Sequence, residues 1–113
     1  MATVLIVDDH PAFRSSARRL LEADGHKVVG EAADGLHAVA AATALAPDVV
    51  LLDVALPDVD GFEVARALRG GPAVILTSSR DWSDVTALIA ETGARGFVAK
   101  DDLSGSVIDE LLA

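Results

Sequence analysis

Residues 5–10 read LIVDDH, an apolar run of strand length that ends on two adjacent carboxylates. Neighbouring like charges repel, and burial at a strand end penalises their ionised form, so this placement requires a compensating partner. One explanation is that Asp8 or Asp9 caps a helix beginning at Pro11, where a carboxylate accepts backbone N–H groups. The other is a site for a hard cation such as Mg²⁺, which prefers carboxylate oxygens and keeps several waters. The motif alone leaves both explanations open.

The composition describes one acidic domain without cysteine. With 113 residues, of which 51% are hydrophobic, the chain 1–113 is expected to form a single domain with a sizeable core. The absence of cysteine excludes disulfides and zinc–thiolate sites and favours a cytoplasmic location. We expect no signal peptide and no membrane contact, because residues 1–9 lack a charged leader region and no apolar run has membrane-spanning length. The formal charge of −9 disfavours direct binding to nucleic acid.

The rest of the chain alternates short apolar runs with helix-length segments. The expected strands are Val4–Val7, Lys27–Glu31, Val49–Leu52, Ala73–Leu76 and Gly96–Ala99. The expected helices lie within 11–25, 35–48, 60–71, 83–94 and 103–113. Because the strands are almost wholly apolar and each is followed by a helix, the pattern predicts an α/β fold in which helices cover both faces of a parallel sheet.

Helical periodicity predicts which side of each helix is buried. In the segment 11–25 the expected buried face consists of Phe13, Ala17, Leu20 and Leu21. In the segment 35–48 it consists of Leu36, Val39, Ala40, Thr43 and Ala44.

Several other residues have ordinary structural interpretations. Ser83 is a candidate cap for the helix within 83–94, and its neighbour Trp82 is either a partner contact or a packing residue. His10, His26 and His37 lie in separate segments, so we expect them to be exposed and do not expect a cluster of histidines around a metal.

Polar side chains stand at the carboxyl ends of four of the expected strands, namely Asp8 and Asp9, Asp53, Thr77 and Lys100. In an open parallel sheet these ends meet at one edge, and ligands bind there near the point where the strand order reverses. Each residue alone has an ordinary explanation as a turn cap or a solvated charge, but their coincidence favours a shared site. Lys100 is one of only two lysines in the chain, which indicates that this strand end requires an ammonium group.

This set of groups is suited to phosphoryl transfer to a carboxylate. A divalent cation held between acids neutralises phosphoryl oxygens and positions the nucleophile. Lys100 supplies a compact positive charge, and the Thr77 hydroxyl can donate to another oxygen. An aspartate can itself attack phosphorus and form an acyl phosphate. Asp53, a single carboxylate after the run VVLLD, is the expected nucleophile, whereas the pair Asp8 and Asp9 has the charge density to hold the metal.

The sequence resembles the receiver domain of a two-component response regulator over essentially its whole length. The segments that carry the resemblance, in the family's order and spacing, are LIVDDH, VVLLDVALPDVDGFEVARALR, AVILTSS and GARGFVAK. The resemblance implies that Asp53 accepts a phosphoryl group from a phosphohistidine of a sensor histidine kinase. It also implies that Thr77 and Lys100 contact this group, and that Thr77 and Phe97 are the switch residues.

The resemblance further implies a cofactor and a fold. Mg²⁺ is expected to bind Asp9 and Asp53 directly, Asp8 through water, and the backbone carbonyl of Ala55. The implied fold is a doubly wound, flavodoxin-like (βα)5 three-layer sandwich with a five-stranded parallel sheet of order 2-1-3-4-5.

Two features of the sequence bear on partners. The motifs VVGEAADG and DDH resemble receivers that are fused to a helix-turn-helix output domain, which implies the regulation of transcription by such a domain or by another partner. The family also implies homodimerisation, either through the surface of 83–94, 96–99 and 103–113 or through 11–25 and 103–113.

Departures from the family pattern limit what can be carried over. Many relatives have a larger or polar side chain at the position of Ala55, so the rate of dephosphorylation is not specified. Phe97 has no hydroxyl, so switching there relies on ring packing, and an ordinary core role is an equal alternative. Asp101 follows Lys100 where a proline is common, so no cis-proline is expected.

Two alternative functions follow from the same residues. A phosphatase of the haloacid dehalogenase type also forms an aspartyl phosphate, but it requires a D-x-D arrangement after the first strand, where this chain reads DDH. A degenerate receiver that only docks partners is disfavoured, because every motif position is occupied. We therefore expect no enzymatic activity beyond the domain's own phosphorylation and dephosphorylation.

Overall fold

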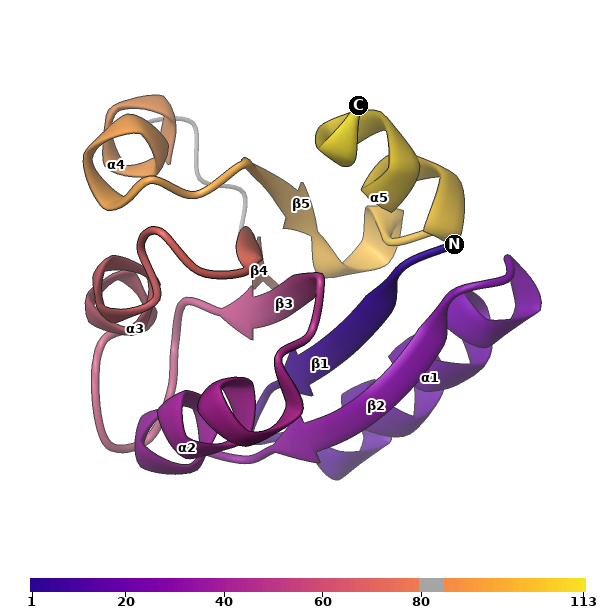
Figure 1. The fold of residues 1–113 in the computed structure, drawn as a ribbon, viewed down its shortest axis with the longest axis horizontal. Helices are drawn as coiled ribbons and strands as arrows, with labels where there is room; N and C mark the ends of the chain where they lie inside the picture. The colour runs from indigo at the N-terminus through magenta and orange to yellow at the C-terminus, as the bar shows by residue number, and fades with distance from the viewer. Residues whose placement is uncertain (80–84) are drawn as a thin grey trace.

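A parallel sheet lies between two layers of helices (Figure 1). The computed structural model describes residues 1–79 and 85–113, and its sheet has five strands in the order β2-β1-β3-β4-β5. The strands are β1 Thr3–Val7, β2 Lys27–Ala32, β3 Val49–Asp53, β4 Ala73–Ser78 and β5 Gly96–Ala99. The helices are α1 Pro11–Ala23, α2 Gly35–Leu45, α3 Gly61–Ala67, α4 Val85–Thr92 and α5 Gly105–Leu112, and a short 3-10 turn, η1 Lys100–Asp102, follows β5. The predicted flavodoxin-like fold and its strand order are confirmed.

The two faces of the sheet carry separate apolar cores, because successive strand residues point to opposite sides. Figure 1 shows α1 and α5 on one face and α2, α3 and α4 on the other. On the first face, Val4 and Ile6 of β1 pack with Leu21 of α1 and Ile108 of α5. On the second face, the intervening strand residues pack under α2 and α3. All residues of β3 are buried, which explains its continuous apolar sequence.

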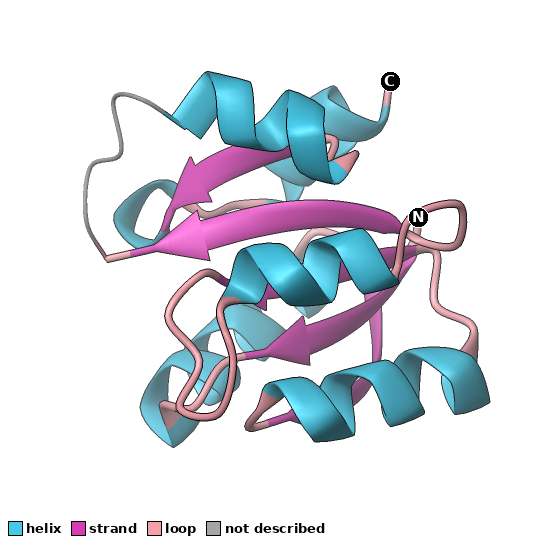
Figure 2. Ribbon diagram, turned by 90° about the vertical axis from the view of Figure 1, so that its left-hand side faces the viewer, coloured by secondary structure: helices cyan, strands magenta, loops and turns pink. Residues whose placement is uncertain are grey.

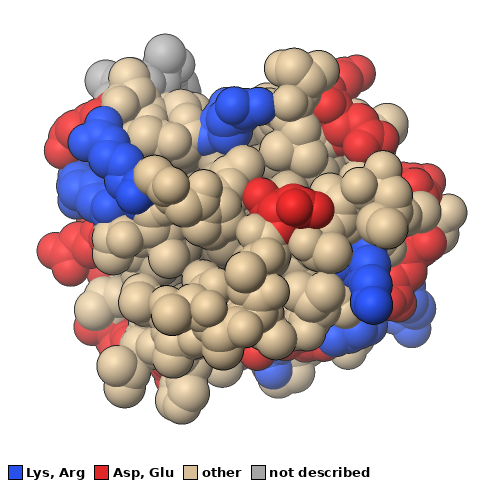
Figure 3. All heavy atoms as spheres, in the orientation of Figure 1, with Lys and Arg blue, Asp and Glu red and all other residues tan. Residues whose placement is uncertain are grey.

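The helix α2 presents a different face to the sheet from the one that periodicity predicts. Its buried residues are Gly35, Ala38 and Ala42, whereas Leu36 is 74% exposed. The small side chains allow the helix to approach the strands closely, and this packing outweighs the burial of the larger residues. The predicted face is therefore the outer one, and the surface over α2 in Figure 3 is mostly uncharged.

His26 is buried, contrary to the expectation from sequence. Its Nδ1 accepts a hydrogen bond from the Ala2 N–H at 3.1 Å, and its Nε2 lies 3.2 Å from the Gly105 carbonyl oxygen. Both ring nitrogens therefore have partners, so the buried ring leaves no polar atom unsatisfied. The ring also joins the start of β1 to the start of α5. The side chains of His10 and His37 are exposed, as expected.

The start of α1 rules out one explanation for the acidic pair. His10 occupies the N-cap position and no side chain caps this helix, so neither Asp8 nor Asp9 is a helix cap. The helices α2, α3 and α5 do have side-chain caps, which are Asp34, Asp60 and Ser104. The predictions for Trp82 and Ser83 fall outside the described residues. Within the described ranges, no helix has the length and apolar character needed to cross a membrane.

Gly61 permits a close passage of the chain beside the end of β3. A Cβ atom at this position would lie 2.4 Å from the carbonyl oxygen of Asp53 and 2.6 Å from the Cα of Val54. Both neighbours are backbone atoms, which no change of rotamer can move away. The Gly61 N–H also donates to the Val54 carbonyl at 2.9 Å, so the loop after β3 is fastened to the strand end.

Gly61→Ala is expected to lower the free energy of unfolding by about 2 kcal/mol or more, because the added methyl group forces the backbone apart. Denaturant titration followed by circular dichroism measures this loss. Gly71→Ala is the matched control, since its Cβ would meet only the Leu68 carbonyl oxygen at 3.3 Å. An equal loss in both variants would contradict the assignment of a special close contact at Gly61.

Candidate functional site: an acidic pocket at the carboxyl edge of the sheet

The predicted strand-end residues do meet at one edge of the sheet. Figure 2 shows the strand arrows pointing to the same side of the molecule. Asp53 is the last residue of β3 and stands in register with Thr77 of β4, while Lys100 follows β5 directly. The strand order reverses between β1 and β3, so Asp8 and Asp9 lie at the topological switch point beside Asp53.

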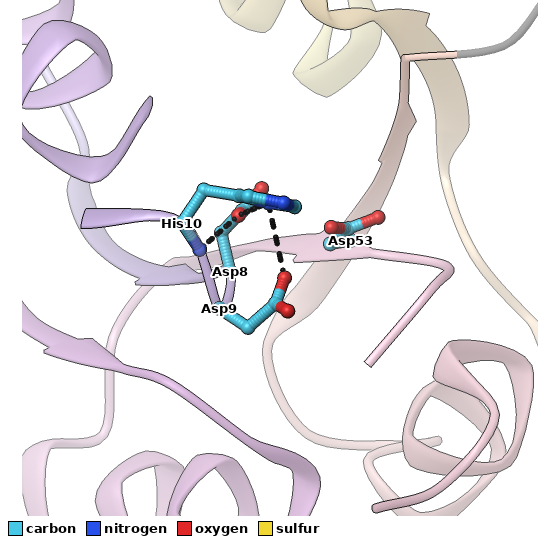
Figure 4. A group of neighbouring side chains, drawn as sticks. All are labelled: Asp8, Asp9, His10 and Asp53. Carbon is cyan, nitrogen blue, oxygen red and sulfur yellow. Dashed lines mark hydrogen bonds and ion pairs between the residues drawn. The ribbon is translucent and has the colours of Figure 1, made fainter. Parts of the chain in front are cut away.

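The carboxylates of Asp8, Asp9 and Asp53 form a cluster with the imidazole of His10 (Figure 4). Each residue offers one ligand atom, and these four atoms all lie within 4.8 Å of one another. Asp8 is fully buried and Asp53 is 2% exposed. Three carboxylates held this closely repel one another, so the cluster requires cations.

Lys100 provides part of the compensating charge. Its Nζ lies 2.5 Å from Asp8 Oδ2 and 3.2 Å from Asp53 Oδ2, and it stands 4.6 Å from the centre of the Phe13 ring. Burial lowers the pKa of Lys100, but the hydrogen bond to Asp8 and the negative charges of Asp53 and Asp8 outweigh burial and raise it. The ammonium is therefore charged at neutral pH and links β5 to β1 and β3.

Asp53 is the carboxylate whose ionised form is disfavoured. Burial raises its pKa above the ordinary value. The N–H of Ala55, which donates to Asp53 Oδ1 at 3.0 Å, opposes this effect, the charge of Asp8 adds to it, and Lys100 opposes it again. A buried carboxylate with a raised pKa beside a lysine, at the switch point of an α/β sheet, is a candidate for a functional group.

Three buried oxygen atoms at this edge have no hydrogen-bond partner among the described residues. The first is the hydroxyl of Thr77, and Thr77 is only 1% exposed. The second is Asp9 Oδ1, which accepts no hydrogen bond although His10 Nδ1 lies 3.0 Å away. The third, Asp8 Oδ2, has the Lys100 ammonium 2.5 Å away as an ion-pair partner. Orphaned polar atoms are costly, so they indicate groups held ready for a ligand. A donor set of carboxylates and an unpaired hydroxyl fits a hard cation and a phosphoryl group.

A pocket of about 310 Å³ opens directly onto Asp53. Its lining residues are His10, Asp53, Val54, Ala55, Ser78, Ser79 and Lys100. Ala55 thus lines the pocket together with Asp53, and its role as a metal ligand stays a prediction, while Asp8 is fully buried and does not line the pocket. Larger hollows lie near α2 and α3, away from these charged groups.

Phe97 is not part of the pocket. It stands in register with Leu76 of β4 and is half-buried against the core on the α2–α4 face of the sheet. Leu76, the partner of Phe97 in the sheet, directly precedes Thr77. The role of Phe97 as a switch residue stays a prediction.

The sequence analysis missed three contributors to the site. His10 was predicted only to be exposed, but its Nδ1 lies 2.9 Å from Asp8 Oδ1. Arg14 of α1 donates to the carbonyl oxygen of Asp8 at 2.6 Å, and Phe13 lies beside Lys100. Their common signal is their position in the first turn of the helix after LIVDD, where side chains lie close to the strand end.

Comparison with known proteins agrees with this geometry. A family profile described as the response regulator receiver domain matches residues 4–110. The nitrate/nitrite response regulator protein NarP of Escherichia coli is 46% identical over 103 residues, which are 87% of this chain and 47% of NarP. The solved signal receiver domain of NarL from Mycobacterium tuberculosis is 38% identical and superposes with a TM-score of 0.87, covering 99% of this chain and 97% of that one.

The chain belongs to the response regulator receiver domain family, the phosphorelay module of two-component systems. It spans about half the length of NarP and other curated relatives. The chain is also similar to part of a protein with an enzyme name. A protein-glutamate methylesterase/protein-glutamine glutaminase of Anaeromyxobacter dehalogenans is 44% identical over 115 residues, which are 96% of this chain and 33% of that protein.

Asp53→Asn is expected to raise the thermal midpoint at pH 7 without divalent cations. Because the folded-state pKa of Asp53 is raised, the ionised carboxylate destabilises the fold above that pKa. The penalty fades as the pH falls through the folded-state pKa towards the ordinary value, so wild type and variant converge in acid. Mg²⁺ at 100 times its dissociation constant should stabilise the wild type by about 2.7 kcal/mol and reverse the order.

Asp58→Asn is the control of opposite sign. The N–H groups of Gly35 and Leu36 donate to Asp58 and help to lower its pKa, so removing its charge should lower the midpoint at pH 7. Thermal unfolding from pH 4 to pH 7, followed by circular dichroism, tests both variants. A lower midpoint for Asp53→Asn at neutral pH in the absence of cations would show that its ionised form is not disfavoured.

Proposed function

We propose that this domain is a phosphorylation-dependent signalling switch in which Asp53 accepts a phosphoryl group from a sensor histidine kinase. The observation that supports it most is the buried Asp53 carboxylate beside the Lys100 ammonium, with the unpaired Thr77 hydroxyl in register on the adjacent strand. A pocket beside this carboxylate offers a path for a donor.

The chemistry proposed is a direct transfer. A carboxylate oxygen of Asp53 attacks the phosphorus of a phosphohistidine, the P–N bond breaks as the P–O bond forms, and the imidazole leaves with the electron pair of the broken bond. A proton from solvent restores the neutral imidazole. The product is an acyl phosphate on Asp53. Lys100 then offers its ammonium to a phosphoryl oxygen, and the Thr77 hydroxyl donates to another.

Mg²⁺ is the proposed cofactor, and when bound it supplies charge neutralisation for the phosphoryl oxygens. Asp9 and Asp53 are the residues that would hold it directly. Both oxygens of Asp8 already have partners, His10 on one side and Lys100 on the other, so a role through water suits Asp8. The Ala55 carbonyl is the fourth proposed ligand, and Ala55 lines the pocket beside Asp53.

The proposed output is the regulation of transcription by an output domain or partner, in the cytoplasm. Two curated relatives, 39% and 38% identical, are named as a putative transcriptional regulator and a probable transcriptional regulatory protein. The acidic charge of −9 argues against DNA contact by this domain itself. Homodimerisation through α4, β5 and α5, or through α1 and α5, is the proposed consequence of phosphorylation. A phosphatase of the haloacid dehalogenase type gains no support, because the pocket is lined by Asp53 and not by Asp8 or Asp9.

Asp53→Asn is expected to abolish labelling by a radioactive small-molecule acyl phosphate, because the amide cannot act as the nucleophile. In the wild type we expect Mg²⁺-dependent label that hydroxylamine removes, as is typical of an acyl phosphate. Asp58→Asn, a neighbouring exposed aspartate, should be labelled as the wild type is. Label that persists on Asp53→Asn would overturn the proposed phosphoacceptor, and turnover of excess phosphomonoester would instead support an enzyme.

Thr77→Ala and Lys100→Ala are expected to permit some phosphorylation of Asp53 but to uncouple it from association. The phosphoryl group adds about −1.5 to −2 charge, which should draw both side chains towards it and let the Phe97 ring move inward behind Thr77. Sedimentation of each protein with and without phosphate measures the change. We expect a response at least about tenfold smaller than in the wild type. Lys27→Ala, at the only other lysine, is the control.

An undiminished response to phosphorylation in both variants would show that the signal leaves the pocket by another route. Loss of the response only in Lys27→Ala would also show that the signal does not pass through Thr77 and Lys100.

A further inference from the structure

His10 lies inside the donor set of the acidic cluster and not merely near it. Its Nδ1 is 2.9 Å from Asp8 Oδ1 and 3.0 Å from Asp9 Oδ1, as Figure 4 shows by dashed lines. The pocket above Asp53 is also lined by this residue. None of the roles proposed above uses the imidazole.

The spacing of these atoms matches the edges of one coordination shell. Ligands about 2.1 Å from an octahedral ion and adjacent to each other are about 3.0 Å apart. The distance from Nδ1 to Oδ1 of Asp9, a proposed direct ligand, has this value, and opposite ligands, about 4.2 Å apart, stay within the 4.8 Å span of the four donor atoms.

We propose that His10 is an additional ligand of the cation, through Nδ1, and that it shifts the preference of the site from Mg²⁺ towards first-row transition ions. This inference rests on the proposed function only in placing the cation between Asp9 and Asp53. In the absence of a cation, Nδ1–H donates to Asp8 Oδ1. When an ion takes that place, the neutral ring carries its single proton on Nε2 and leaves the Nδ1 lone pair free to coordinate.

The ligand types determine which ions benefit. Mg²⁺ favours oxygen ligands and keeps its waters, so an imidazole adds little to its binding. Co²⁺, Ni²⁺ and Zn²⁺ accept imidazole readily, and Mn²⁺ tolerates it. The His10 side chain is 66% exposed, so the ring lies at the open side of the cluster, where an ion arrives from solvent.

The orphaned atoms at the same edge support a ligand-ready state independently of the acidic residues. The Thr77 hydroxyl is buried and has no partner among the described residues, in register with Asp53. The cluster is therefore arranged for added groups and not closed upon itself.

The test compares wild type with His10→Ala, His10→Asn and His37→Ala, all unphosphorylated. His37 is a matched control, because its Nδ1 also lies 2.7 Å from a carboxylate oxygen, that of Asp34, on an exposed surface away from the site. His10→Asn keeps a side-chain N–H donor for the carboxylates but has no imidazole, so it separates ligation from positioning. Calorimetric titrations use Mg²⁺ alone and Co²⁺ alone.

Both His10 variants should bind Co²⁺ about tenfold or more weakly than the wild type, while their Mg²⁺ affinity changes less than about threefold. His37→Ala should match the wild type for both ions. In Mn²⁺-loaded protein, electron spin echo modulation should report a directly bound ¹⁴N nucleus in the wild type and in His37→Ala but not in the His10 variants.

Three results would overturn the inference: no ¹⁴N modulation in the wild type, equal weakening of Mg²⁺ and Co²⁺, or tighter Mg²⁺ binding after loss of the imidazole. These results are separable from the proposed function. A wild type that binds Mg²⁺ and is labelled on Asp53, yet shows no bound nitrogen, would remove only the role of His10. Wild-type protein with His10-dependent Co²⁺ binding but no phosphate label would remove only the phosphoacceptor.

Discussion

The contact on which the site depends is the Lys100 ammonium held between Asp8 and Asp53. It joins the end of β5 to the ends of β1 and β3, across a β4 that contributes Thr77. Two buried carboxylates this close to each other cannot both stay ionised without a nearby cation, and the lysine supplies one that is built into the chain. The same contact orders the edge of the sheet before any ligand binds. In the proposed function, an arriving phosphoryl group would therefore compete for an ammonium that is already in place.

The fold brings these groups together from distant parts of the sequence. Asp8 and Lys100 are separated by most of the chain, yet parallel strands place their carboxyl ends at one edge. Continuous apolar strands buried on both faces fix the register, because every strand residue is committed to one core or the other. The loop after β3 is fastened at Gly61, where the backbone comes too close for any side chain. The Gly61 N–H bond to the Val54 carbonyl holds the loop at this close distance beside Asp53.

The sequence was informative where a residue's role follows from strand order and was misleading where it follows from packing detail. The motif LIVDDH and the run VVLLD predicted the site because strand ends converge whatever the neighbouring side chains are. The buried face of α2 was predicted wrongly, since alanines in contact with the sheet outweigh the larger Leu36 and Val39, and hydrophobicity alone does not report closeness. His26 was also missed: its burial depends on the Ala2 N–H and the Gly105 carbonyl, which no local pattern connects.

The charges at the pocket explain why one lysine is not enough. Three carboxylates face one ammonium, and His10, if neutral, adds only a hydrogen-bond donor. Phosphorylation would bring a further charge of about −1.5 to −2 into a place that burial already makes unfavourable for the ionised Asp53. Asp9 and Asp53 would hold the proposed divalent cation, which would supply the missing positive charge between the carboxylates. The Lys100 ammonium would then be needed less by the aspartates and could pair with the phosphoryl oxygens of the proposed product. In the proposed function, binding of the cation and readiness to accept phosphate are therefore coupled by electrostatics, through the close placement of Asp8, Asp9 and Asp53.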